Sequence, residues 1–92
     1  MFDFENLNVY QKARELNKEI LTLIESLPDL KVHFRDQLSR ASTSILLNIA
    51  VGSGKWSPRD KRNFYFQARG SSYECVSVLQ IIRDINMIRE DS

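Results

Sequence analysis

Apolar residues recur at alternating spacings of four and three in three parts of this chain, and this spacing places side chains on one side of an α-helix. It predicts helices over about 6–27, 32–53 and 58–88. Three such helices in one short chain favour an all-α fold, an antiparallel up-and-down bundle with small crossing angles. The expected core positions are, in chain order, Val9, Ala13, Leu16, Ile20, Leu23 and Leu27; Phe34, Leu38, Ala41, Ile45, Asn48 and Gly52; and Phe64, Ala68, Ser71, Cys75, Val78, Ile82 and Ile85.

Local signals mark where two of these helices end and begin. Pro28 followed by Asp29 should end the first helix, because proline cannot continue a helical hydrogen-bond ladder. Ser57 is suited to cap the third helix, with Pro58 at the first helical position and Asp60 three residues after the cap. Asp60 would also interact favourably with the positive end of the helix dipole.

Residues 41–54 carry no charge, although 27% of the chain is charged. A helix in this run would present apolar groups on several sides, including Leu47 and Val51. We therefore expect this helix to be enclosed by its two sister helices and by another chain.

Small residues occupy the middle of the second and third helices. Ala41 and Ser42 on one helix and Ala68 and Gly70 on the other predict a close approach there. Asn48 on an apolar stripe requires a hydrogen-bond partner. The candidate partners, which would make a polar contact that fixes helix register, are Ser71, Ser72 and Glu74.

Length and composition limit the protein further. Ninety-two residues with 42% hydrophobic content allow one domain, residues 1–92. A single cysteine fits a reducing compartment, and neither a secretory signal nor a run of about 20 apolar residues is present. These features favour a cytoplasmic protein that does not enter a membrane.

The order of these residues resembles the 23S rRNA intervening-sequence protein family. The residues that carry the resemblance are Phe4-Glu5-Asn6-Leu7, Val9, Tyr10, Gln11, Lys12 and Ala13; Arg40-Ala41, Ser44-Ile45, Asn48-Ile49-Ala50, Gly52 and Gly54; and Ala68-Arg69-Gly70-Ser71 with Glu74. The resemblance implies a small bacterial protein of the four-helix-bundle type that assembles as a homo-oligomer, a ring of five. Related accessory proteins of diversity-generating retroelements use a similar basic pentamer to engage nucleic acid and a reverse transcriptase.

Two positions depart from the family pattern. Val51 stands where the family commonly has an acidic residue, so a polar role there is lost. The sequence stops just beyond the third stripe, where family members usually continue into a fourth helix. Apolar surface that such a helix would cover is then expected to be covered by a neighbouring subunit.

Charge is unevenly distributed along the chain. Residues 31–69 hold eight basic and two acidic side chains, whereas the segments before and after are net acidic. A second stripe on the third helix, opposite its core, alternates arginines with aromatic rings: Arg59, Arg62, Phe66, Arg69 and Tyr73, with Lys55, Trp56 and Lys61 near its start. Guanidinium groups beside aromatic rings suit phosphate contacts and base stacking.

The stripe allows more than one interpretation. The nucleic-acid candidates are Arg40, Lys55, Arg59, Lys61, Arg62 and Arg69. Phe66, Tyr73, Leu47 and Val51 could instead pack against a neighbouring subunit, with the arginines paired to its acids, or the stripe could simply be solvated. A protein-adaptor oligomer without a nucleic-acid role is thus the alternative to RNA or DNA binding.

Enzymatic chemistry has weaker support in the sequence. Asn48 and Glu74 lack an accompanying nucleophile or second acid, so we expect no catalytic residues. His33 has no second His or Cys at ligand spacing, which argues against a metal site or a cofactor, and Cys75 lies on a core stripe.

Overall fold

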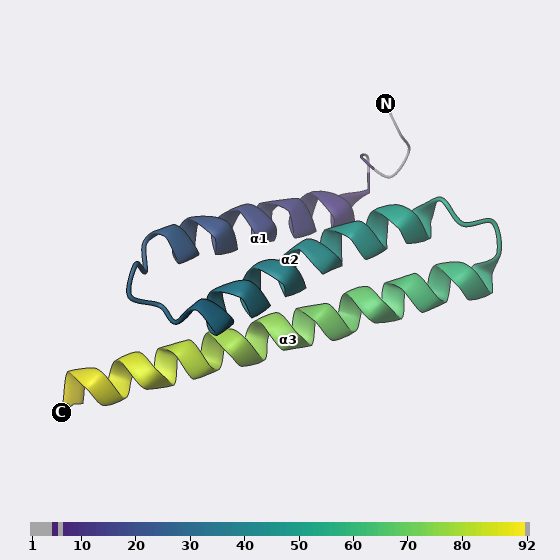
Figure 1. The fold of residues 1–92 in the computed structure, drawn as a ribbon. Helices are drawn as coiled ribbons and strands as arrows, with labels where there is room; N and C mark the ends of the chain where they lie inside the picture. The colour runs from purple at the N-terminus through teal and green to yellow at the C-terminus, as the bar shows by residue number, and fades with distance from the viewer. Residues whose placement is uncertain (1–4, 6, 92) are drawn as a thin grey trace.

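The computed structural model describes residue 5 and residues 7–91, with side chains described as far as residue 85. These residues form three helices, α1 (Asn8–Glu25), α2 (Val32–Ser53) and α3 (Pro58–Asp91), and no strand. The helices run alternately up and down, and α3 extends beyond the α1–α2 turn at its C-terminal end (Figure 1). The all-α bundle predicted from the spacing is confirmed.

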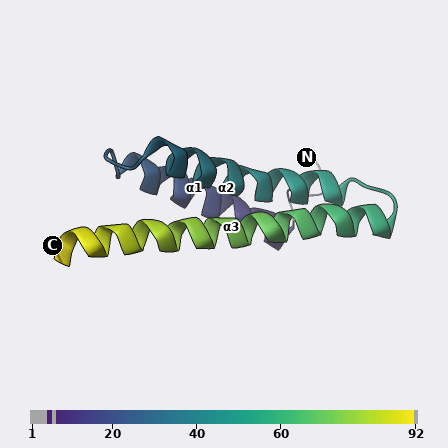
Figure 2. The same cartoon turned by 60° about the horizontal axis from the view of Figure 1, so that its bottom comes forward.

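Helix α2 lies between the other two helices. It packs against α3 and against α1, whereas α1 and α3 make no direct backbone approach to each other among the described residues. A view turned by 60° shows α2 alongside α3, with α1 on the far side of the pair (Figure 2). The helix that contains the uncharged run 41–53 is therefore the central element, as expected from the sequence, while its enclosure by another chain stays a prediction.

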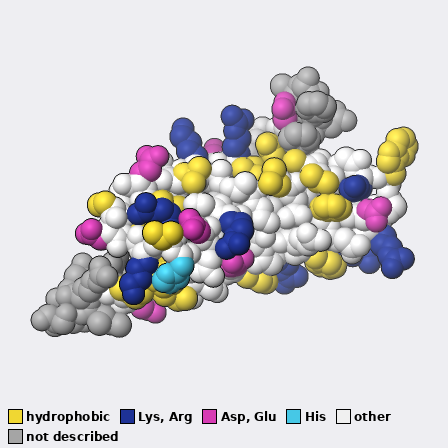
Figure 3. Space-filling model, viewed as in Figure 1, with side chains coloured by type: hydrophobic (Ala, Val, Ile, Leu, Met, Phe, Trp, Pro, Cys, Tyr) yellow, Lys and Arg dark blue, Asp and Glu magenta, His cyan; other side chains and the backbone are white. Residues whose placement is uncertain are grey.

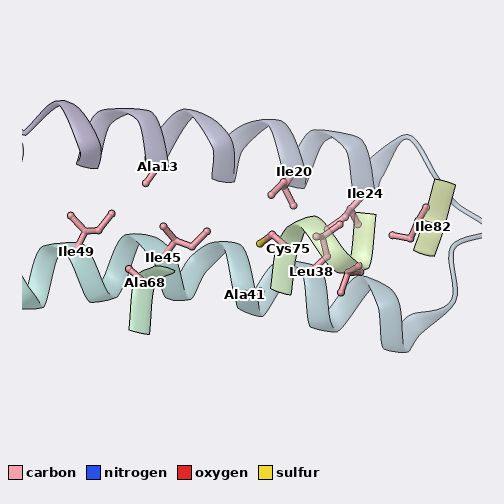
Figure 4. Packing of buried hydrophobic residues seen from close by; sticks show 11 residues of the cluster. Ala13, Ile20, Ile24, Leu38, Ala41, Ile45, Ile49, Ala68, Cys75 and Ile82 are labelled. Carbon is pink, nitrogen blue, oxygen red and sulfur yellow. The ribbon is translucent and has the colours of Figure 1, made fainter. Parts of the chain in front are cut away.

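The core fills the space between the three helices along most of their length. Its buried apolar residues are Ala13, Ile20 and Ile24 of α1, Leu38, Ala41, Ile45 and Ile49 of α2, and Ala68, Cys75, Val78 and Ile82 of α3. The α1 and α2 side chains point toward one another, and α3 closes the same cluster (Figure 4). Leu38 is completely buried. The α3 core therefore follows the predicted stripe.

The predicted faces of α1 and α2 are wrong by one residue at two positions. Ile24 is buried where Leu23 was expected, and Ile49 is buried where Asn48 was expected. Successive side chains lie about 100° apart around a helix. The spacing of apolar residues therefore predicts that one face is buried, but not exactly how that face is turned toward the core. Because α2 is covered on two sides, its buried face extends to Ile49 and leaves Asn48 at the edge.

Two further expected core residues of α1, Val9 and Leu16, are exposed along an open groove. The groove runs between α1 and α3, and its floor is formed by Ile45 and Ile49. Its walls include Leu7, which precedes α1, with Val9 and Leu16 from α1 and Tyr65, Ala68 and Arg69 from α3. The α3 backbone does not approach α1 among the described residues, so Val9 and Leu16 are left uncovered, although side chains of α1 and α3 share the core farther along.

The close approach of α2 and α3 depends on Gly52 and not on Gly70. A Cβ atom at position 52 would lie 2.8 Å from Phe64 Cβ and 3.1 Å from Tyr65 Cε1. At position 70 a Cβ would meet nothing within 4 Å, so the close helix approach predicted at Gly70 is absent. Gly70 lies on an exposed part of α3, away from the seam.

Ser42 also has a different role from the one expected. It is buried, and its Oγ donates a hydrogen bond of 2.7 Å to Asn17 Oδ1 of α1, with a longer contact of 3.2 Å to the Ser39 carbonyl. This small residue therefore links α2 to α1 instead of lining the α2–α3 seam.

The start of α3 follows its sequence signals. The Asp60 backbone N–H donates a hydrogen bond of 3.0 Å to Ser57 Oγ, and Pro58 is the first helical residue. At the other turn α1 ends at Glu25, shortly before Pro28, and Arg35 Nη2 lies 3.4 Å from the carbonyl oxygens of Leu27, Pro28 and Leu30. The guanidinium thus offers donors to carbonyls that follow the end of α1.

Substitution of the two glycines with alanine should have opposite effects on stability. Gly52→Ala forces α2 and α3 apart at a cost of about 1–3 kcal/mol, which exceeds the small gain in propensity near a helix end. Gly70→Ala meets open space in mid-helix and should stabilise the protein by about 1 kcal/mol. Urea unfolding followed by circular dichroism would measure both. Equal shifts of the two midpoints would contradict the close approach at Gly52.

Ser42→Ala should lower the free energy of unfolding by about 1–2 kcal/mol, because it leaves the half-buried Asn17 amide oxygen without its donor. Ser39→Ala is the matched control, because Ser39 Oγ bonds to the Arg35 carbonyl on its own helix and not to another helix. That control should change stability by less than about 0.5 kcal/mol. Similar losses in both variants would show that the α1–α2 link is not what Ser42 contributes.

Candidate nucleic-acid interface

The second stripe of α3 lies on the side of the helix opposite the core. Its five members, Arg59, Arg62, Phe66, Arg69 and Tyr73, are all exposed. Phe66 is 57% exposed and Tyr73 is 58% exposed, so both rings are accessible. At 1.5 Å per residue the stripe spans about 21 Å along α3.

Arg69 and Tyr73 form a local pair in the stripe. Arg69 Nε donates a hydrogen bond of 2.8 Å to the Tyr73 hydroxyl, and the guanidinium carbon lies 5.3 Å from the centre of the Tyr73 ring. One turn of helix brings the two side chains together. The hydrogen bond uses one of five N–H donors, so the guanidinium retains donors for an anionic ligand.

More cationic groups lie where α2 and α3 join. Lys55 Nζ lies 5.1 Å from the centre of the Phe64 ring, a cation–π contact that holds the ammonium group near the start of α3. Lys61 is half-buried in the first turns of α3. Lys and Arg side chains gather at this end of the molecule around an acidic side chain (Figure 3).

Arg40 lies apart from the other candidates, on α2. It is exposed and borders a shallow hollow together with Thr43, Leu47 and Asn48. Leu47 and Val51 are also exposed on α2. The structure therefore brings Lys55, Arg59, Lys61, Arg62 and Arg69 onto α3 and the turn before it, and leaves Arg40 on another helix.

The polar contact expected at Asn48 exists in a different form. Asn48 Nδ2 donates to the carbonyl and hydroxyl oxygens of Ser44, at 2.8 and 3.0 Å. Ser71 Oγ donates to Ser44 Oγ at 2.9 Å, so Ser44 makes the link between α2 and α3. Glu74 is exposed and takes no part in this contact. Ser44 was missed as a bridging residue because its spacing places it beside the predicted stripe and not on it.

A model of the 23S rRNA-intervening sequence protein family matches residues 5–92. The chain belongs to this family. The match confirms the resemblance found in the sequence, although the family description states no activity. No match was found among curated proteins or among solved structures.

His33 is the single histidine of this family member. His33 is exposed on α2, and its ring lies 4.1 Å from the Phe34 ring, centre to centre. The described residues contain no group of three or more His, Cys, Asp or Glu side chains placed to hold a metal ion. None of the helices, over their described residues, is long and apolar enough to cross a membrane.

Cys75 is a buried thiol on the core face of α3. Burial raises the pKa of the Cys75 thiol above its ordinary value, and the neighbouring negative charge of Glu74 raises it further. Because the thiolate is the nucleophilic form, the Cys75 side chain is poorly reactive in the folded protein.

The raised pKa of Cys75 predicts a loss of stability at high pH. Above the ordinary value of 9.0, the unfolded chain loses its thiol proton while the folded chain still holds it, so unfolding becomes more favourable. Cys75→Ala lacks this effect and carries a constant loss of packing. Unfolding in urea would measure the free energy of unfolding of both proteins at pH 7 and pH 10. The wild type should be more stable than Cys75→Ala by a smaller amount at pH 10 than at pH 7. A difference that stays constant with pH would contradict the raised pKa.

Proposed function

We propose that this protein is a non-enzymatic, homo-oligomeric helical bundle that presents a basic surface of α3 to RNA or DNA. The observation that carries the proposal is the exposed stripe of arginines and aromatic rings on the face of α3 opposite the core. Arginine provides planar, charged donors for phosphate oxygens, and exposed rings offer surfaces on which bases stack.

Local charge supports a polyanionic ligand. Residues 55–62 contain Lys55, Arg59, Lys61 and Arg62 against a single acidic residue, Asp60. Asp60 lies in the first turn of α3, next to the cap bond that its backbone makes to Ser57. The basic side chains at this end therefore outnumber the acidic one, and they continue into the stripe.

Exposed apolar surface supports assembly with further copies of the chain. Val9 and Leu16 line the groove between α1 and α3, and its floor consists of the core residues Ile45 and Ile49. Covering such a surface gains roughly 25 cal/mol for each Å² of apolar area removed from water. A subunit count of five comes from the family resemblance and belongs to the proposal.

A second candidate is an adaptor oligomer with no nucleic-acid role. The exposure of Phe66 and Tyr73 in the middle of the stripe favours it, because large aromatic residues are enriched in subunit interfaces. In that arrangement the arginines beside these rings would pair with acidic side chains of the next subunit. The two candidates differ in what charge reversal does to the assembly.

Reversal of two stripe charges, Arg62→Glu with Arg69→Glu, should weaken binding to labelled structured RNA and duplex DNA by at least about tenfold at low salt. A plot of log affinity against log salt concentration has a negative slope, and each lost phosphate contact should reduce the magnitude of that slope by about 0.9. Fluorescence anisotropy over a salt series would measure both quantities. Light scattering should give an unchanged oligomer mass.

The matched control is Arg14→Glu with Lys18→Glu, which makes the same charge change on the exposed side of α1. It should retain most of the affinity. If wild type shows no binding at low salt, or binding without salt dependence, the nucleic-acid proposal fails. If Arg62→Glu alone, a change outside the groove that Arg69 borders, dissociates the oligomer to monomers while the control does not, the stripe is a subunit interface and the adaptor role is favoured.

A further inference from the structure

We infer that Trp56, at the turn between α2 and α3, is a stacking site for unpaired nucleobases, so that the protein prefers single-stranded nucleic acid to duplex. This inference rests on the proposed function and specifies the ligand of the same basic surface. It depends on the exposure of Trp56, the packing that holds it outward and the charges around it.

Trp56 is 99% exposed, more than any other large hydrophobic residue described. An indole that packs inside a protein removes a large apolar area from water, so full exposure forgoes that stabilisation. The turn joins the end of α2 at Ser53 to the start of α3 at Pro58, at one end of the bundle (Figure 1). A ring at this position is accessible to a ligand.

Neighbouring contacts explain why the indole does not fold back onto the bundle. Phe64 and Tyr65 already pack against the Gly52 position, where even an added Cβ would lie 2.8 Å from Phe64 Cβ. Lys55 covers the Phe64 ring from the turn, with Nζ 5.1 Å from its centre. Phe64, Tyr65 and Lys55 thus occupy the surface around Gly52, and Trp56 remains exposed beside them.

Charges near Trp56 fit the backbone of a single strand. Lys55 precedes it, and Arg59, Lys61 and Arg62 follow within the first turns of α3, within about 8 Å along the helix axis from Ser57. A base stacked on the indole would place its neighbouring phosphates among these cations. Stacking of this kind tolerates any base, because every base has a flat π-face.

Duplex is disfavoured at this site for a geometric reason. In a double helix both faces of an internal base are covered by its neighbours, so the indole can stack on that base only after unstacking it at a cost of a few kcal/mol. An unpaired base in a loop or single strand exposes its face without that cost. Phosphate contacts alone would distinguish single-stranded from double-stranded nucleic acid less strongly than base stacking does.

A lipid surface is a less suitable partner for the same residues. Tryptophan and basic side chains do occur where proteins meet membranes, but stable attachment of a helix there requires a continuous apolar face. After Trp56 the chain continues with Ser57, Pro58, Arg59 and Asp60, which supply no such face. The described helices also include none that could cross a membrane.

Intrinsic fluorescence tests the inference directly, because Trp56 is the single tryptophan of the chain. An unlabelled 15-nucleotide oligoadenylate should quench the emission of the wild-type oligomer, whereas a 15-base-pair duplex should quench it little. By anisotropy with labelled strands, Trp56→Ala should weaken binding of the single strand roughly 5-fold to 150-fold and change duplex binding less than twofold. Trp56→Phe, which keeps a ring, should retain most of the single-strand affinity.

Other outcomes overturn the inference in distinguishable ways. If single strands bind with salt dependence but neither quench Trp56 nor respond to Trp56→Ala, the stacking site is wrong and the proposed function stands. If neither nucleic acid binds wild type at low salt, the proposed function fails and the stacking site with it. If the emission maximum of the free oligomer is blue-shifted to that of a buried indole, Trp56 is a subunit contact. If anionic vesicles shift the emission and oligoadenylate does not, Trp56 is a lipid contact.

Discussion

The whole structure depends on α2 being able to pack on two sides. The backbones of α1 and α3 each lie against α2 and make no direct approach to each other among the described residues, so side chains from all three helices meet in one core built around α2. That requirement explains the lack of charge at the buried positions of residues 41–54, whereas Leu47 and Val51 of the same run are exposed. It also explains Gly52, where α3 comes so close that a Cβ atom would collide with Phe64. A charged or larger residue on the buried sides of α2 would separate a helix from the core.

Packing on one side of α3 leaves its opposite side available for other functions. The core needs Ala68, Cys75, Val78 and Ile82, and these residues occupy one stripe of the helix. Short hydroxyl contacts, Ser71 with Ser44 on one side of α2 and Ser42 with Asn17 on the other, set how the helices align. Since these polar links involve buried or half-buried atoms, they favour a single register. The outer stripe of α3 is consequently held in a fixed position by residues that do not belong to it.

The periodicity of the sequence predicted the helices and the α3 core, and local capping signals predicted where α3 begins. Ser57 and Pro58 act through neighbours in sequence, so their roles follow from sequence alone. The exact rotation of α1 and α2 could not be predicted. Whether Leu23 or Ile24 is buried, and whether Asn48 or Ile49 is buried, depends on which sides of the helix other helices cover. For the same reason the sequence did not distinguish Gly52, at a close contact, from Gly70, in open space. In the candidate interface, the spacing predicted the shared face of Arg62, Phe66 and Arg69, but the separate position of Arg40 depends on tertiary packing.

Arg69 lies where the two proposed uses of the surface meet. Its side chain borders the groove between α1 and α3, together with Tyr65 and Ser72, and it also bonds to Tyr73 in the exposed stripe. A polypeptide that filled the groove would therefore contact the same guanidinium that is available to a phosphate. Trp56, by contrast, lies in the turn at the end of the bundle, outside the residues that line the groove. If another copy of the chain covers the groove, assembly would alter the freedom of Arg69, and contact with the groove lining alone would not cover Trp56. Binding at the stripe would then depend on assembly, whereas stacking at the turn would be an intrinsic property of each subunit.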